Sequence, residues 1–118
     1  MLTVDDSPTV RQHLKTTLET AGYHVTQGES GEEGAQIAEV EKFDLLITDL
    51  NMPGMDGLEM LTRIRRKVIN RDTPAFVLTT QARDSETKAR AGLVRVTAWV
   101  VKPLNPELLL RGIRLVLS

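Results

Sequence analysis

The chain contains no cysteine, few aromatic residues and no long apolar run. The missing cysteines exclude disulfides, thiolate metal sites and cysteine nucleophiles. No apolar stretch approaches the roughly 20 residues that a membrane-spanning helix needs, and no secretory signal opens the chain. We therefore expect a cytoplasmic protein with no membrane partner. The 15 basic and 16 acidic residues nearly balance, which argues against a nucleic-acid-binding surface covering the whole molecule.

Length and composition fit one soluble globular domain over residues 1–118, with 41% hydrophobic and 26% charged residues. Short apolar runs alternate with amphipathic segments along the whole chain. The runs predict strands at 1–4, 24–26, 44–49, 75–79 and 97–101. This alternation predicts an α/β fold: a doubly wound, five-stranded parallel sheet in the flavodoxin-like order 2-1-3-4-5, with helices on both faces.

Local signals mark where the helices between these strands begin and end. Ser7, followed by proline, is typical of a helix start, and Gly22 of the end of that helix. Ser30 and Glu33 match a capping box, in which each side chain accepts a backbone hydrogen bond from the other residue. Apolar residues at helical spacing predict a third helix over 58–68. A fourth is expected from about Ser85, and a fifth after Asn105 and Pro106.

Polar and charged residues stand where the predicted strands end. Asp5 and Asp6 follow the first strand, and Asp49 ends the third. Thr79 ends the fourth, and Lys102 follows the fifth. Because the carboxyl ends of parallel strands meet at one edge of the sheet, we expect these residues to lie together.

Carboxylates gathered in this way suit a divalent cation. Mg²⁺ prefers oxygen ligands and is usually held by one or two carboxylates together with water. A carboxylate can also act as a nucleophile and form an aspartyl phosphate. A metal ion, a lysine such as Lys102 and a hydroxyl such as that of Thr79 would offset the negative charge of an incoming phosphoryl group.

Four segments of the chain resemble the signatures of a bacterial two-component response regulator receiver domain, in family order and at family-like spacing. They are Val4-Asp5-Asp6-Ser7, Asp49-Leu50-Asn51-Met52-Pro53-Gly54-Met55-Asp56-Gly57, Leu78-Thr79-Thr80 and Val101-Lys102-Pro103. The resemblance covers the whole chain and is nearest to the single-domain chemotaxis type. It implies a phosphorelay signalling protein rather than an enzyme, with no reaction beyond its own phosphorylation and dephosphorylation.

The resemblance assigns a role to each residue of the acidic site. Asp49 is the expected phosphoacceptor and, with Asp6 and the main-chain carbonyl of Asn51, a direct ligand of Mg²⁺. Asp5 is expected to hold a water bound to the metal. Thr79 and Lys102 are expected to contact oxygens of the phosphoryl group.

The resemblance also implies a switch and a set of partners. Thr79 is expected to couple phosphorylation to Trp99, and so to the face formed by the fourth helix, fifth strand and fifth helix. Asn51 and Gln81 occupy positions that tune the rate of dephosphorylation in the family, and the bond from Lys102 to the following proline is cis there. The expected partners are a histidine kinase or phosphotransfer protein and an unknown output protein, with no direct nucleic-acid binding. The chain is expected to be a monomer or weak homodimer.

Other interpretations remain open at this stage. A haloacid-dehalogenase-like phosphatase needs an acid two residues after its nucleophile, where this chain has Asn51. A flavodoxin-like mononucleotide binder needs a glycine- and hydroxyl-rich loop where this chain has acids. A receiver-like interaction module without phosphorylation is the third alternative. Separately, a purely structural role for Trp99, packed on the sheet, also remains open.

One departure from the family pattern stands near the predicted switch. Arg95 occupies the turn after the fourth helix, where the family usually has glycine. A positive φ at this arginine would cost roughly 1–3 kcal/mol. We interpret His13 and His24 as surface residues, and the basic run at 63–67 as a solvated helix end.

Overall fold

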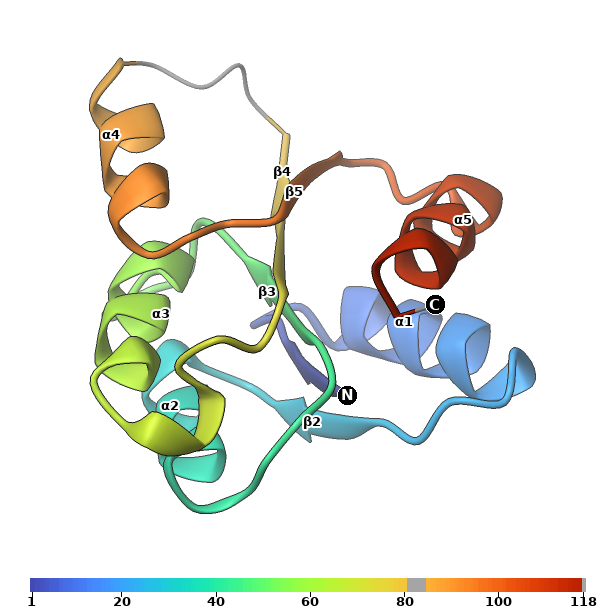
Figure 1. Cartoon of the computed structure of the whole chain (residues 1–118). Coiled ribbons are helices and arrows are strands. Elements are labelled where there is room, and N and C mark those ends of the chain that lie inside the picture. The colour runs from blue at the N-terminus through green and yellow to red at the C-terminus, as the bar shows by residue number, and fades with distance from the viewer. Residues whose placement is uncertain (81–84, 118) are drawn as a thin grey trace.

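Five parallel strands form the centre of the molecule, in the order β2-β1-β3-β4-β5. The computed structural model describes residues 1–80 and 85–117. Helices α1 and α5 cover one face of the sheet, and α2, α3 and α4 cover the other (Figure 1). The elements are β1 (Leu2–Val4), α1 (Pro8–Thr20), β2 (Thr26–Gly28), α2 (Gly31–Val40), β3 (Leu46–Asp49), α3 (Gly57–Arg65), a 3₁₀ turn (Val68–Asn70), β4 (Ala75–Thr79), α4 (Ser85–Leu93), β5 (Ala98–Val101) and α5 (Pro106–Leu117). This confirms the predicted fold and strand order.

The apolar strands are explained by burial on both sides of the sheet. Along β4, Val77 packs in the core on the α2–α3 side, whereas its neighbours Phe76 and Leu78 pack on the α1–α5 side. A parallel sheet covered on both faces needs apolar residues at successive positions, because side chains alternate between faces. The central strands therefore read as continuous hydrophobic runs.

Helix caps agree with the sequence signals, with one correction. The Ser7 side chain accepts a hydrogen bond from the backbone of the first turn of α1, and Gly22 has a φ of 95° after its end. The Ser30 side chain accepts from the Glu33 N–H, as predicted. However, the Glu33 carboxylate accepts from the Glu29 N–H, at 2.9 Å, and not from that of Ser30. The predicted reciprocal capping box at α2 is therefore wrong in its second half.

Several element boundaries also differ from the prediction by one to three residues; β3, for example, starts at Leu46 rather than at residue 44. β2 covers Thr26–Gly28 rather than residues 24–26, because these are the residues that pair with Leu2–Val4 of β1. α3 ends at Arg65 rather than at Val68, because the following N–H groups bond three residues back and tighten the chain into a turn. No helix in the described ranges is long and apolar enough to cross a membrane.

In the turn after α4, Arg95 has a positive φ of 57°, so the case in which arginine adds strain is the one observed. Its guanidinium donates to Asp72 at 2.7 Å and to the Arg71 carbonyl. Beneath it, Arg65 donates to the carbonyls of Val94 and Arg95, at 3.0 and 3.4 Å. The arginine therefore combines a strained backbone with side-chain contacts that fasten the turn.

A pair of substitutions separates the backbone strain from these contacts. Arg95→Gly and Arg95→Ala both remove the guanidinium, but only glycine accepts a positive φ without a steric penalty. We expect the glycine variant to be more stable than the alanine variant by about 1 kcal/mol, measured by urea unfolding. Equal stabilities would show that the turn relaxes without strain.

Candidate functional site

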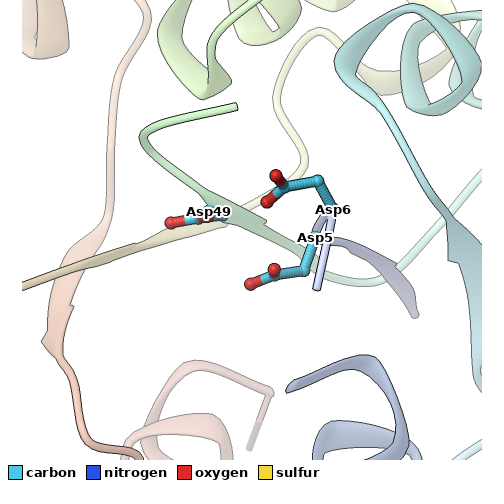
Figure 2. A group of neighbouring side chains, drawn as sticks. All are labelled: Asp5, Asp6 and Asp49. Atoms are coloured by element: carbon cyan, nitrogen blue, oxygen red, sulfur yellow. The ribbon is translucent and has the colours of Figure 1, made fainter. Parts of the chain in front are cut away.

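Three carboxylates meet at the carboxyl edge of the sheet, where β1 and β3 lie side by side. Asp5 and Asp6 follow β1, and Asp49 is the last residue of β3. Thr48, the residue before Asp49, pairs with Val4 of β1. One oxygen from each carboxylate lies within 4.8 Å of the others. Figure 2 shows the three side chains near one another at the ends of the two strands. The sequence prediction that these acids lie together is confirmed.

Lys102 joins this cluster from the end of β5. Its ammonium nitrogen lies 3.3 Å from an oxygen of Asp5 and 3.2 Å from an oxygen of Asp49. Its backbone N–H donates to the Thr79 carbonyl at 2.8 Å, which fixes the lysine beside the end of β4. The site therefore contains three carboxylates and one ammonium and remains negatively charged.

The three acids have different surroundings. Asp5 is fully buried, and its two oxygens accept from the Ser7 N–H and from Lys102, at 2.9 and 3.3 Å. Asp49 is also buried, whereas Asp6 is exposed. Among the described residues, none donates a hydrogen bond to the Asp6 side chain.

Burial and charge shift two pKa values in the site. Burial, and then the neighbouring charge of Asp5, raise the pKa of Asp49, although Lys102 opposes them. For Lys102, burial alone would lower the pKa, but Asp5 and Asp49 together raise it. Both shifts favour the protonated form of the group, because the cluster has an excess of negative charge. A bound cation would offset that excess as well. The donor set is all oxygen, which fits a hard cation such as Mg²⁺.

The raised pKa of Asp49 predicts a pH-dependent stability. Below about pH 4 its carboxyl is protonated in both folded and unfolded chains. Between the unfolded pKa and the raised folded pKa, the unfolded chain binds fewer protons than the folded chain. The free energy of unfolding therefore falls as the pH rises through this range. We expect this decline in chelator-treated protein, and a weaker one in Asp49→Asn or with saturating Mg²⁺. Urea unfolding across this pH range measures it; identical pH profiles for wild type and Asp49→Asn would contradict it.

The predicted switch residues lie on adjacent strands. Thr79 ends β4 and is buried, whereas Thr80 is exposed. In the β4–β5 register Thr79 pairs with Val101, and Val77 pairs with Trp99. Since residues two apart share a face, Thr79 and Trp99 are diagonal neighbours on one face of the sheet. Gln81, the other predicted tuning residue, lies outside the described residues.

Trp99 borders two hollows on the molecule. It is half-buried and packs against the core on the α2–α3 side. One apolar cavity beside it lies between β5 and α5, and a second hollow lies against α4, where Lys88 and Arg95 line it. A change in the position of Trp99 would therefore alter the surface around β5.

The loop over residues 50–56, which contains Asn51, is held at several points. The Gly57 N–H closes it by donating to the Leu50 carbonyl at 2.9 Å. The Glu32 carboxylate, from α2, accepts from the Met55 N–H at 2.8 Å. Asp56 forms a capping box with Glu59 at the start of α3. The Asp-x-x-Glu spacing carried that signal, although the sequence interpretation treated this stretch only as a loop.

One contact of this loop had no local sequence signal. The Arg90 guanidinium, from α4, lies 3.0 and 2.9 Å from the two oxygens of Asp56. The two residues are 34 positions apart, and α4 reaches α3 only in the folded molecule. Sequence reasoning missed this ion pair.

Comparison with known proteins agrees with the fold. The family model described as response regulator receiver domain matches residues 1–114. A chemotaxis protein CheY homolog of Campylobacter jejuni is 37% identical over 113 residues, covering 92% of this chain and 85% of that protein. Chemotaxis protein CheY1 of Helicobacter pylori is 35% identical over 127 residues, covering 100% and 96%. The structure of Vibrio cholerae chemotaxis protein CheY4 superposes with a TM-score of 0.90 at 40% identity, covering 98% and 95%.

Proposed function

This chain belongs to the response regulator receiver domain family, and we propose that it is a signalling switch that accepts a phosphoryl group on Asp49 in a Mg²⁺-dependent reaction. The observation that carries the proposal is the cluster of Asp5, Asp6 and Asp49 with Lys102. The family's general chemistry requires acids and a lysine gathered in one place. This chain supplies both at the carboxyl edge of its sheet.

The residues present fit a Mg²⁺ ion. Asp6 and Asp49, with the main-chain carbonyl of Asn51, would hold it, and the carboxylate of Asp5 would orient a water of the ion's shell. When bound, Mg²⁺ supplies positive charge that offsets the repulsion between an acidic site and an anionic phosphoryl group. The remaining protein groups position the nucleophile and bind the incoming oxygens.

Asp49 is placed to act as the nucleophile. We expect one of its carboxylate oxygens to attack the phosphorus of a phosphohistidine on a histidine kinase or phosphotransfer protein. A phosphorus–oxygen bond forms while the phosphorus–nitrogen bond breaks, and the imidazole leaves with the electron pair. Lys102 already holds a positive charge 3.2 Å from an oxygen of Asp49, where it would stabilise the negative charge of the transferred group. The buried Thr79 hydroxyl would contact another phosphoryl oxygen.

The switch would pass from Thr79 to Trp99. The two residues are diagonal neighbours on one face of β4 and β5, so a shift of Thr79 toward the phosphoryl group would change the space available to Trp99. The face of α4, β5 and α5 would then change shape and be recognised by an output protein. In this proposal the chain catalyses no reaction on other substrates.

Trp99 fluorescence tests the proposal, because Trp99 is the only tryptophan. Beryllofluoride imitates a phosphoryl group bound to a carboxylate, and we expect it to change the fluorescence of wild type only when Mg²⁺ is present. Asp49→Asn should show no such change. If both proteins behaved alike, the chain would be better described as a receiver-like interaction module without phosphorylation.

A further inference from the structure

Two arginine contacts help to attach helix α4 to the rest of the molecule. Of its described side chains only Ala91 is buried, and Leu93 at its end is 84% exposed. At the carboxyl end, Arg65 of α3 donates to the Val94 carbonyl that follows the helix. Nearer the middle, Arg90 pairs with Asp56. Polar contacts therefore contribute to fixing this helix.

The Arg90–Asp56 pair differs from the other contacts of α4 because it reaches the loop of the acidic site. One guanidinium nitrogen contacts both oxygens of Asp56, at 3.0 and 2.9 Å. The same carboxylate accepts from the Glu59 N–H at 2.8 Å and so caps α3. Asp56 is the last residue of the 50–56 loop, whose other end follows Asp49 directly. One carboxylate thus joins α4, α3 and the loop that carries Asn51.

We propose that Arg90 is a positioning residue for the acidic site: through Asp56 it restrains the 50–56 loop from α4 and so links the position of α4 to cation binding. This inference rests on the proposed function. A loop that is already held in place loses less conformational freedom when the Asn51 carbonyl becomes a ligand of the cation. The restraint therefore favours cation binding. By linkage, a cation that fixes the loop must in turn favour the docked position of α4.

The link is separate from the one between Thr79 and Trp99. It runs from the β3–α3 loop directly to α4 and uses neither β4 nor β5. A protein that binds α4 and moves it would break the Arg90–Asp56 pair, release the loop and weaken cation binding. The expected size is modest, since Arg90 is 38% exposed and Asp56 24% exposed. Partly exposed ion pairs correspond to about a two- to five-fold change in an equilibrium constant.

The test is a double-mutant cycle on the full chain, with Mg²⁺ alone as the probe. Arg90→Met removes the positive charge of the arginine side chain. Asp56→Ser removes the carboxylate but keeps a residue that caps α3. Lys88→Met, an exposed lysine on the same helix, is the matched control, and Arg90→Lys keeps the charge. Calorimetry gives the Mg²⁺ affinity, and hydrogen exchange followed by mass spectrometry gives the protection of α4 with and without Mg²⁺.

We expect Arg90→Met and Asp56→Ser each to weaken Mg²⁺ binding about two- to five-fold, and the variant that carries both changes to bind Mg²⁺ no more weakly than the weaker of the two. Mg²⁺ should raise the protection of α4 in wild type and in Lys88→Met but not in Arg90→Met, with Arg90→Lys partly restored. Unchanged Mg²⁺ affinity in the variants, additive effects, or an equal effect of Lys88→Met would overturn the proposal. If wild type bound no Mg²⁺, the proposed function itself would fail; if wild type bound it and Arg90→Met matched wild type, only the positioning role would fail.

Discussion

Replacing Gly57 with alanine is expected to destabilise the protein by about 3 kcal/mol and to displace Asp49. A Cβ atom at position 57 would lie 2.2 Å from the main-chain oxygen of Asp49 and 3.2 Å from a methyl carbon of Thr48. The first of these is a backbone atom and cannot rotate away. The chain must therefore shift at the start of α3 or at the end of β3, where the candidate nucleophile stands.

Gly92→Ala is the matched control: Gly92 also lies in a helix, but apart from its chain neighbours and its own helix backbone no atom of the described residues lies within 4 Å of an added Cβ. There alanine should stabilise the protein by up to about 1 kcal/mol through its better helix propensity. Urea unfolding measures both variants, and Mg²⁺ affinity reports the position of Asp49. A Gly57→Ala variant as stable as wild type, with unchanged Mg²⁺ affinity, would show that the close approach to Asp49 imposes no constraint.

Replacing Lys102 with methionine is expected to have the second large effect. The substitution keeps most of the length of the side chain but leaves the buried carboxylates of Asp5 and Asp49 without their cation. Removing one partner from a buried ion pair costs about 3 kcal/mol. This loss should shrink at low pH, where Asp49 binds a proton, and in Mg²⁺, which would replace the missing positive charge. Phosphorylation of Asp49 should fall by about 100-fold.

Lys67→Met provides the comparison, since Lys67 is 59% exposed and lies 4.0 Å from Glu39. Its loss should change the free energy of unfolding by no more than about 0.5 kcal/mol and leave phosphorylation intact. Unfolding curves with and without Mg²⁺ distinguish the two lysines. If Lys102→Met behaved like Lys67→Met in both assays, the ammonium would have no role in balancing the acidic site.

The acidic site could be predicted from the sequence because its residues stand at strand ends. Asp5, Asp49 and Lys102 each follow or end a run of apolar residues, and a parallel sheet brings the carboxyl ends of all such runs to one edge. No long-range contact had to be known. The positive φ of Arg95 was raised only as a conditional case, from the glycine that the resembled family usually has in this turn, and the structure decides it.

Other features depend on contacts between distant parts of the chain. The position of β2 follows from its register with β1, in which Leu2–Val4 pair with Thr26–Gly28, and the local sequence does not give that register. The buried Asn70 side chain binds the Phe43 N–H and the Ala38 carbonyl, at 2.9 and 2.7 Å, and nothing near it in the sequence indicates either partner. The Arg90–Asp56 pair belongs to the same class, since only the packing of α4 against α3 brings its members together.

Chemical trapping of the phosphoryl group tests the central claim most directly. The full chain is incubated with a small-molecule phosphodonor with and without Mg²⁺, reduced with borohydride to convert any acyl phosphate to a stable product, and mapped by peptide mass spectrometry. We expect modification of wild type at Asp49 only, dependent on Mg²⁺ and absent from Asp49→Asn. No modification of wild type in Mg²⁺, or an equal extent of modification in Asp49→Asn, would contradict the assignment of Asp49 as the phosphoacceptor.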